Sequence, residues 1–303
     1  MPLRAAGYQG SGSILTRALH VFADALADAP TSLACAVEDD VTAIGETARS
    51  LFDSIEAGER QIGYMASGYL SARVPELSVL DLPFTVQDRA FALKALDGAV
   101  GEMLDHAVSQ RSGLKVLGFW DNGFRHLTNQ RHPIRQPADC LGLKVRTIDS
   151  ADYRAALAAL GFQALTIDVR DLVSAVAGGR VDAQENPLAN FLLFEIWRHH
   201  RFVSLTSHLF GVVLLVCNAA WWHLLPADQR RRVCQAARKS CVVQRRLAAE
   251  EDQRALAVLK TLGTDVLLAS AIDLPALQAC CQSLVAARRL VLPGQLFDHY
   301  VQS

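Results

Sequence analysis

The chain has 303 residues, of which 51% are hydrophobic and 20% are charged, and its formal net charge is −1. This composition predicts a folded globular protein, long enough for two domains or one large one, and it excludes intrinsic disorder. A net charge near zero gives no electrostatic reason to expect nucleic acid or an anionic membrane as a partner.

The first third of the chain alternates predicted strands with predicted helices. The helices follow from apolar residues at helical spacing, and the strands from short apolar runs next to turn signals. This alternation indicates a parallel sheet with helices on its faces. We expect strands at 3–8, 33–37 and 61–65, and helices at 14–27 and 44–57.

The ends of these strands are where a ligand would bind, because open α/β sheets bind ligands beyond the carboxyl ends of their strands. Tyr8 ends the first strand, and Ser67, Gly68 and Tyr69 follow the third. The Gly/Ser turn at 9–13 lacks the lysine and the spacing of a P-loop, so no nucleotide cofactor is expected.

The rest of the chain continues the alternation. Asp168 is the expected N-cap of a helix that Gly178-Gly179 ends. The segment 226–262 runs without a helix breaker and is long enough to lie across two domains. We expect helices at 88–110, 147–159, 168–177, 226–262, 274–287 and 295–301, and strands at 114–119, 164–166, 181–183, 202–207 and 211–217.

Two arginines stand at the ends of predicted strand segments. Arg125 follows an Asn-Gly turn signal, and Arg146 closes the strand that reads LKVR. A guanidinium held at the end of a strand offers a planar fork of donors, which suits the two oxygens of a carboxylate. The pattern therefore predicts binding of an organic acid, although a single arginine is more often an ordinary surface residue.

Three segments carry a resemblance to a known family: NGFRHLTNQRHPI from Asn122, PADCLGLKVR from Pro137 and GGRVDAQENP from Gly178. In this order and spacing they resemble the substrate-binding subunits of TRAP transporters, the tripartite ATP-independent periplasmic systems. The likeness extends in weaker form over most of the chain. It implies a solute-binding protein that captures a small organic acid by domain closure and delivers it to the membrane subunits.

The resemblance also implies a ligand site. The family arginine that pairs with the ligand carboxylate corresponds to Arg146, and Arg125 and Asn186 would help to hold the ligand. Val169 occupies a position where several family members place an aromatic against the ligand, which leaves more room here. Capping of the helix after Pro187 is the alternative role for Asn186. Further expected ligand contacts are Tyr8, Ser67, Tyr69, Trp120 and Phe210.

The positive charge of Arg125 needs a partner, because a monocarboxylate supplies only one negative charge. Either a second polar group of the ligand binds it, or a protein acid neutralises it. Asp121 and Glu185 are the nearest acids by sequence. We favour the ligand, because Asp121 lies four residues back across the Asn-Gly signal.

The fold implied by the resemblance is α/β: a two-domain, periplasmic-binding-protein-like fold with a central cleft, crossing hinge strands and a long helix that spans both domains. The hinge strands are expected near 120–123 and 210–211. The expected domain boundaries are 1–122 plus 208–249 for the first domain, and 123–207 plus 250–303 for the second.

The N-terminus and the cysteines bear on location. MPLRAAGYQGSGS lacks the apolar segment of about 7–15 residues that marks a secretory signal. Either a signal was removed and replaced by a start Met, or the protein stays in the cytoplasm. Seven cysteines without framework or metal-ligand spacing predict neither disulfides nor a metal site, and they slightly favour the cytoplasm. The resemblance outweighs this and favours the periplasm.

Three classes of function are compatible with the sequence. The resemblance favours a monomeric binding protein. No direct membrane insertion is expected, since the longest apolar run, Leu209 to Cys217, is far shorter than the roughly 20 residues of a membrane span. A ligand-sensing or orphan receptor of the same fold is the alternative. An enzyme acting on a small carboxylic acid is the third, with His126, His132 and Asp121 as candidate groups. No catalytic motif supports it, so no enzyme is expected.

Overall fold

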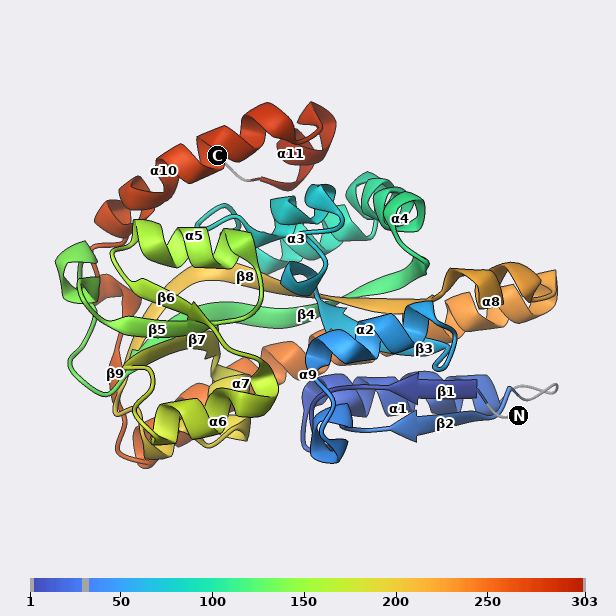
Figure 1. Cartoon of the computed structure of the whole chain (residues 1–303), viewed down its shortest axis with the longest axis horizontal. Helices are drawn as coiled ribbons and strands as arrows, with labels where there is room; N and C mark the ends of the chain where they lie inside the picture. Colours follow the sequence, from blue (N-terminus) through green and yellow to red (C-terminus); the bar gives the residue numbers. More distant parts are fainter. Residues whose placement is uncertain (1–2, 29–32, 302–303) are drawn as a thin grey trace. The chain divides into compact units, whose positions relative to one another are not determined.

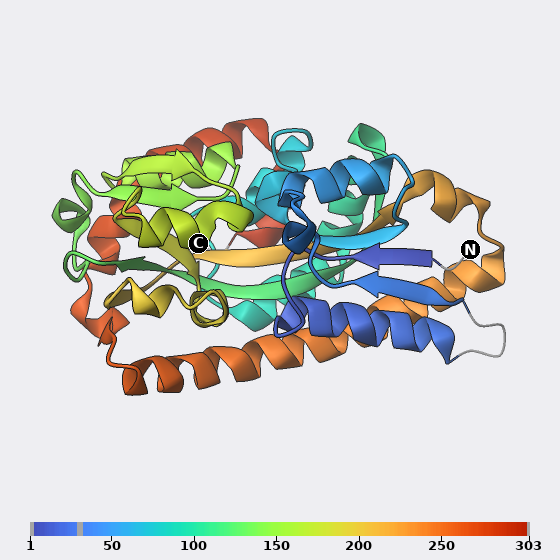
Figure 2. The same ribbon diagram turned by 60° about the horizontal axis from the view of Figure 1, so that its bottom comes forward.

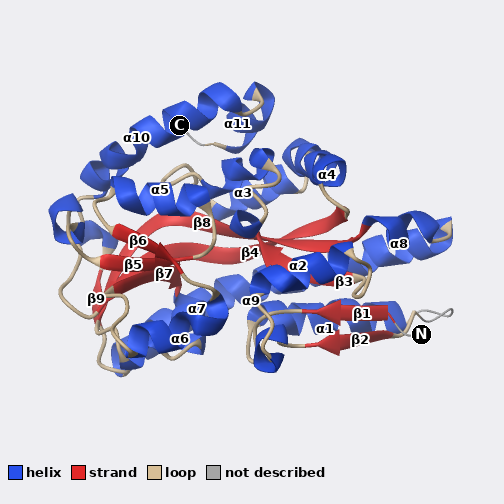
Figure 3. Ribbon diagram, viewed as in Figure 1, coloured by secondary structure: helices blue, strands red, loops and turns tan. Residues whose placement is uncertain are grey.

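The computed structural model describes residues 3–28 and 33–301, and it is a mixed α/β structure throughout (Figures 1 and 3). The chain divides into two compact units. The first unit holds the described residues up to Ala66, Leu93–Asp121 and Val212–Ala249. The second unit holds Ser67–Ala92, Asn122–Gly211 and the residues from Glu250 onward. The chain therefore passes between the units at five points.

The sheet of the first unit is built from the predicted strands. Strand β1 (Leu3–Ala6) pairs in parallel with β2 (Cys35–Glu38) and with β3 (Ile62–Ala66). Strand β8 (Phe202–Asn218) adds its last residues antiparallel to β3, from Val213 opposite Ala66 to Cys217 opposite Ile62. The parallel strands agree with the sequence prediction, because each follows a helical crossover.

Helices cover this sheet. The Ser13 hydroxyl caps α1 (Ile14–Ala27), whose apolar side is buried. Helix α1 lies beside the part of α9 (Ala227–Thr261) that belongs to this unit (Figure 2), where the Ser240 hydroxyl donates to the Ala18 carbonyl over 2.9 Å. The other helices of this unit are α2 (Ala48–Glu56), α4 (Ala99–Arg111), α8 (Ala219–Leu224) and the second half of α3 (Arg89–Leu96).

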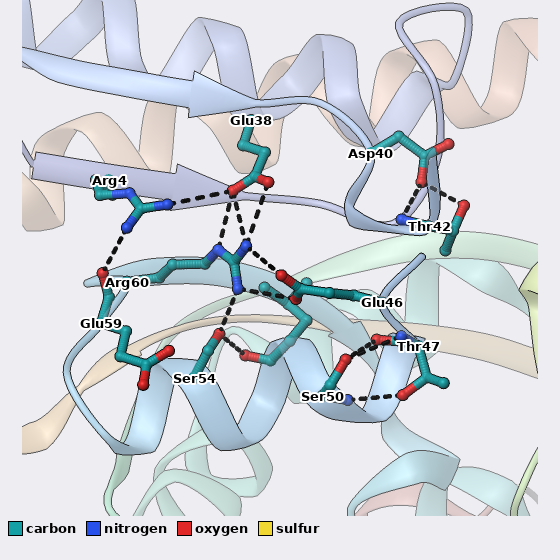
Figure 4. Close-up of polar contacts among 11 residues, drawn as sticks. Arg4, Glu38, Asp40, Thr42, Glu46, Thr47, Ser50, Ser54, Glu59 and Arg60 are labelled. Atoms are coloured by element: carbon teal, nitrogen blue, oxygen red, sulfur yellow. Dashed lines mark hydrogen bonds and ion pairs between the residues drawn. The ribbon is translucent and has the colours of Figure 1, made fainter. Parts of the chain in front are cut away.

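A buried arginine ties α2 to the neighbouring strands (Figure 4). The Arg60 guanidinium donates from Nε and Nη2 to Glu38, and from both Nη atoms to Glu46, at 2.9–3.2 Å. Its Nη1 also donates to the Ser54 hydroxyl on α2 over 2.9 Å. Arg60 is only 5% exposed, so these bonds replace the water that its charge would otherwise need.

The second unit contains its own set of paired strands. Strand β4 (Leu114–Asn129) pairs antiparallel with β7 (Ala183–Pro187) over its last five residues. Strand β5 (Lys144–Thr147) pairs in parallel with β6 (Gln163–Thr166) and with β7. The first residues of β8 pair in parallel with β9 (Asp265–Leu267).

Two apolar cores lie on opposite faces of this sheet. One packs α5 (Ala151–Ala159) and α10 (Leu274–Val291) against the strands, through residues such as Leu157 and Leu277. The other packs α6 (Val169–Ala177) and α7 (Leu188–Leu193), through Leu172 and Phe191. Figure 1 shows α5 on one side of β5–β7, and α6 on the other. The final helix is α11 (Gly294–Tyr300).

Several predicted elements differ from the structure. The helix expected at 88–110 is two helices, α3 and α4, because the chain breaks at Asp97-Gly98. The helix expected at 44–57 begins only at Ala48, after a short 3₁₀ turn. The strands expected at 202–207 and 211–217 are one strand, β8.

The Asn-Gly signal before Arg125 is not a turn. Gly123 has a positive φ of 87° but stands inside the continuous strand β4. A Cβ at Gly123 would meet the Asp252 carboxylate at 3.2 Å and Pro187 at 3.3 Å. Glycine is therefore required by backbone conformation and close packing inside a strand, which a local turn rule cannot detect.

The predicted α/β class is confirmed, and so is a long helix, since α9 matches the expected 226–262 within one residue at each end. The expected domain boundaries stay a prediction; the unit that holds all of 123–207 also includes Ser67–Ala92. Within the described ranges, none of the helices combines the length and the apolar character that crossing a membrane requires.

Candidate functional site

Arg125 and Glu185 form a buried ion pair in the second unit. The antiparallel register of β4 and β7 sets Leu127 opposite Glu185, so that Arg125 lies two residues along on the same side of the ladder. Arg125 Nε donates to Glu185 Oε2, and Nη2 donates to Glu185 Oε1 and to its carbonyl oxygen at 2.9 Å each. Arg125 is 2% exposed and Glu185 is fully buried.

The surroundings of the pair favour the charged forms of both Arg125 and Glu185. Burial raises the pKa of Glu185, but the Arg125 charge and hydrogen bonds to the carboxylate outweigh it and lower the pKa to about 2. Thr147 on β5 donates to Glu185 Oε1 over 2.8 Å, and the Arg125 guanidinium lies 5.2 Å from the ring centroid of Tyr153. The charges of the pair therefore cancel each other, and Thr147 and Tyr153 hold it in place from outside its own two strands.

Glu185 thus supplies the counter-charge of Arg125. The favoured expectation, in which a ligand group takes that role, is wrong for this structure. Asp121 is not the partner either, since it belongs to the first unit, where its backbone N–H donates to Gln244 Oε1 over 2.7 Å. The register of two strands brings Arg125 and Glu185 together across 60 residues of sequence, and sequence distance alone could not rank the two acids.

Arg146 is a buried cation with an unused donor. It lies in β5 and is only 1% exposed. Its Nε donates to the Ile167 carbonyl over 2.8 Å, whereas Nη2 is buried and has no hydrogen-bond partner within the part of the chain that the structure describes. Burial lowers the pKa of Arg146, the Arg125 charge adds to this, and Tyr69 opposes it. A buried guanidinium donor without an acceptor is costly, which points to an acceptor from outside the chain.

Asn186 lies in β7 and joins the Arg125 side of the site. Its Oδ1 accepts from Arg125 Nη2 over 3.3 Å, and its Nδ2 donates to Gln184 Oε1 over 2.5 Å. Gln184 in turn donates to the Thr128 hydroxyl over 2.6 Å, so the amide is oriented by a buried chain. The helix-cap alternative for Asn186 is wrong, because the N-cap of α7 is Pro187, without a side-chain bond.

Ser67 and Tyr69 begin the second unit, in the 3₁₀ turn Ser67–Tyr69. The Ser67 hydroxyl lies 2.6 Å from Oδ1 of Asp81, and both residues are fully buried. Burial raises the pKa of Tyr69 to about 12, although the Arg146 charge lowers it. Tyr69 therefore stays a neutral phenol beside the Arg146 cation.

The remaining predicted contacts divide between the two units. Val169 starts α6 at the half-buried edge next to Asp168, and Phe210 packs on Phe124 with ring centroids 5.1 Å apart. Tyr8 and Trp120 belong to the first unit, where both stack on Tyr64. Those stacking contacts give both residues a packing role, and their contact with a ligand stays a prediction.

A separate cavity of about 390 Å³ lies elsewhere in the second unit and is mainly apolar. It does not include the arginines or Asn186, so its lining lacks the charge that an acid needs. Its lining residues are Phe84, Val86, Gln87, Phe124, Thr206, Ser207, Leu274, Pro275 and Gln278.

The described residues at the site suit neither the role of metal ligand nor that of catalytic general base well. Among the described residues, no group of three or more His, Cys, Asp or Glu side chains could hold a metal ion. His126 Nδ1 accepts the Ser207 backbone N–H over 3.1 Å, and burial, aided by His208, lowers the pKa of His126 to about 3. A neutral, occupied imidazole of this kind is a weak general base at neutral pH.

Among solved structures, the whole chain matches two-domain solute-binding proteins. A TRAP periplasmic solute-binding protein from Polaromonas sp. JS666, bound to D-erythronate, is 25% identical with a TM-score of 0.93, covering 100% of this chain and 99% of that one. The sugar acid binding protein DctPAm from Advenella mimigardefordensis, in complex with galactonate, is 23% identical with a TM-score of 0.92, covering 99% and 96%. The fold is therefore that of the TRAP solute-binding proteins.

The sequence comparisons define the family. The description "Bacterial extracellular solute-binding protein, family 7" (DctP) matches residues 9–289. The 2,3-diketo-L-gulonate-binding periplasmic protein YiaO of Escherichia coli K12 is 31% identical over 220 residues, which is 73% of this chain and 67% of that protein. A solute-binding protein of Verminephrobacter eiseniae is 30% identical, covering 72% of this chain and 65% of that protein. The chain belongs to the DctP family of extracellular solute-binding proteins.

Proposed function

We propose that this chain is the solute receptor of a TRAP transport system and that it binds a small organic acid through Arg146. The observation that carries the proposal is the buried Arg146 guanidinium, whose Nη2 has no acceptor within the described chain. A carboxylate would satisfy that donor and balance the charge in one contact. The family and the acids bound by its solved members support the same chemistry.

The charge balance favours a hydroxylated monocarboxylate. Glu185 already neutralises Arg125, so of the two arginines described at the site Arg146 is the one left for an anionic group. Asn186 is bonded to Arg125. Tyr69 lies beside Arg146, and Ser67 stands in the same turn as Tyr69. These polar groups are neutral and suit ligand hydroxyls, which exchange hydrogen bonds without adding charge. Sugar acids have this composition, and galactonate, D-erythronate and glucuronate are the ligands of solved family members.

The remaining parts of the proposal follow from the family. The receptor works in the periplasm, closes its two units over the acid, and passes it unchanged to the membrane subunits. It acts as a monomer and without a cofactor. Co-purification with the membrane subunits of a TRAP system, encoded in the same genome, tests delivery. Recovery of the bound acid chemically unchanged after prolonged incubation tests the absence of turnover.

The substrate class is tested by a thermal-shift screen with galactonate, D-erythronate, glucuronate, galacturonate, pantoate and succinate. An acid at 100 times its Kd should stabilise the protein by about 2.7 kcal/mol. We expect the hydroxylated monocarboxylates to stabilise more than succinate, because succinate brings a second negative charge and the second arginine described at the site, Arg125, is already paired with Glu185. A larger shift with succinate would contradict the charge argument.

The role of Arg146 is tested by calorimetry on Arg146→Ala and Arg146→Lys. Loss of a charge-assisted pair in a closed site should weaken binding by about 2–5 kcal/mol. Lysine should also fail, since a point charge cannot reproduce the guanidinium fork. Arg180→Ala is the matched control, because Arg180 is an exposed arginine of another motif segment, GGRVDAQENP. A Kd within threefold of the parent value for either Arg146 variant would contradict the role of Arg146 as the carboxylate-binding residue.

A further inference from the structure

Asp81 is a buried carboxyl group that the proposed function does not use. It ends the 3₁₀ segment η3 (Pro75–Asp81) and is fully buried. Its Oδ1 lies 2.6 Å from the Ser67 hydroxyl, while its Oδ2 is buried and has no hydrogen-bond partner within the described ranges. An ionised carboxylate in such a place would be costly, because its charge would be neither paired nor fully hydrogen-bonded.

The cation that acts on Asp81, and the cation bonded to its neighbour Asp152, are already engaged by other acids. Arg125 on β4 is held by Glu185 on β7, and Arg288 donates from Nε to Asp152 on α5 over 2.7 Å. Asp152 and Glu185 are themselves anionic neighbours, and both disfavour a third negative charge. The titratable or charged groups that face Asp81 from the elements around it are Arg125, Glu185, Asp152 and Tyr153, with Tyr300 on α11, which packs against η3.

These surroundings favour the neutral acid. Burial raises the pKa of Asp81 to about 8, and the Ser67 hydrogen bond and the more distant Arg125 charge oppose it only in part. At neutral pH these surroundings favour the protonated form of the group. That proton is best placed on Oδ1, because an O–H on the partnerless Oδ2 would be a buried donor without an acceptor.

We propose that Asp81 is a neutral carboxylic acid that sets the hydrogen-bond polarity of Ser67 toward the bound acid. The inference rests on the proposed function, in which Ser67 contacts the ligand. A protonated Asp81 donates to Ser67 Oγ, so the Ser67 hydroxyl hydrogen is available to a ligand oxygen. Once Asp81 ionises, Ser67 must donate back to it, and only the serine lone pairs face the ligand. Asp81 is thus a positioning residue that couples acid binding to a proton.

The proton on Asp81 can be observed without any ligand. Infrared difference spectra of the ligand-free protein, wild type minus Asp81→Asn, should contain the C=O stretch of a protonated carboxyl group at pH 7. The band should disappear on titration with a midpoint near the pKa of about 8. A carboxylate band at pH 7 instead would overturn the proposal, whatever the protein binds.

The coupling is measured by calorimetry with the tightest-binding acid of the thermal-shift panel, between pH 6.5 and 9.5. Such acids are ionised throughout this range, so the protein supplies any titration. Wild-type affinity should fall above the midpoint, approaching about tenfold per pH unit. Proton uptake on binding, measured in buffers of different ionisation enthalpy, should be about one half at the midpoint and should rise toward one above it. Wild-type affinity that does not change with pH would overturn the coupling.

Two variants separate a relay from a merely structural role. Asp81→Asn mimics the neutral acid, since its NH₂ group can donate to Ser67, and it should bind within threefold of wild type at pH 7 with a flat pH profile. Ser67→Ala should weaken binding at pH 7 and flatten the profile. Asp182→Asn is the control, because Asp182 is paired with Arg131 and should keep the wild-type profile.

The two proposals fail in different ways. If wild type binds none of the acids, the proposed function is wrong, and the infrared titration still decides whether Asp81 carries a proton. If acids bind but Asp81→Asn keeps the wild-type dependence on pH, the inference about Asp81 is overturned and the proposed function stands.

Discussion

The two arginines of the candidate site differ in their hydrogen-bond and charge partners, and this difference decides what each can do. Arg125 is matched by Glu185, with which it forms a nearly closed unit. Arg146 keeps a buried donor without a partner in the described structure. The first arginine therefore organises the site, and the second is the one that an anion would stabilise.

The worth of the Arg125–Glu185 pair can be measured. Arg125→Met leaves Glu185 buried without its counter-charge, so the free energy of unfolding should fall by about 3–5 kcal/mol. Adding Glu185→Gln should recover much of this loss, because the orphaned charge is removed. Urea denaturation of the single and double variants gives the coupling. Additive losses would mean that the two residues act independently, against the bonds described above.

Asp81 makes stability depend on pH in a direction opposite to that of an ordinary paired acid. Its pKa is about 8 when folded and about 4 when unfolded, so the native state binds more protons between these values. This contribution is therefore present below pH 4 and is lost as pH rises toward 8. Relative to Asp81→Asn, the wild type should lose on the order of 4 kcal/mol between pH 5 and pH 9, because each pH unit between pH 5 and the folded pKa contributes about 1.4 kcal/mol. Urea midpoints at both pH values check the sign, and a relative gain by wild type would refute it.

At the scale of elements, the strands of the second unit bring the site together. Antiparallel β4 and β7 join Arg125 to Glu185 and Asn186, while β5, parallel to β7, adds Thr147 and Arg146. The short η3 and the turn at Ser67 bring the Asp81–Ser67 pair. No single element holds the site, so its geometry depends on the packing of the whole unit.

In the first unit, Arg60 offers a test of how one residue secures an element. It links α2, through Ser54, to Glu38 on β2 and to Glu46 before α2 (Figure 4). Because the two carboxylates are about 30% exposed, Arg60→Met should cost a moderate amount, about 1–3 kcal/mol, with faster amide exchange in α2. Arg4→Met is the control: Arg4 reaches Glu38 only at 3.7 Å and is 56% exposed. Equal losses in both variants would contradict the role of Arg60.

At the scale of the whole molecule, the chain passes between its units at five points, and β4, β8 and α9 each contribute residues to both. Continuous elements of this kind suit a hinge in a solute-binding protein. Small-angle X-ray scattering should therefore record a smaller radius of gyration with a saturating acid from the panel than without it. Arg146→Ala should show no such change at the same acid concentration. An unchanged wild-type radius under saturation would contradict closure.

Family membership and most of the fold follow from local signals in the sequence. Helical periodicity predicts α1 and the long α9, and the Asp168 cap marks the start of α6. The resemblance of the three motif segments to the family implies Arg125, Arg146 and Asn186 as residues of the candidate site. The incorrect predictions also come from local signals. Asn122-Gly123 has the composition of a turn, yet strand β4 continues through it. The glycine is required there because Asp252 and Pro187 pack closely against it.

The sequence by itself determined the α/β class, the order of most elements and the three polar residues of the candidate site, because periodicity, caps and contiguous motifs are properties of neighbouring residues. Only the tertiary structure decided which acid neutralises Arg125, that Arg146 keeps an unused donor, and that Asp81 lies buried against Ser67. These properties depend on strand register and on exclusion of water. Both arise when segments far apart in the chain pack together, so no local pattern encodes them.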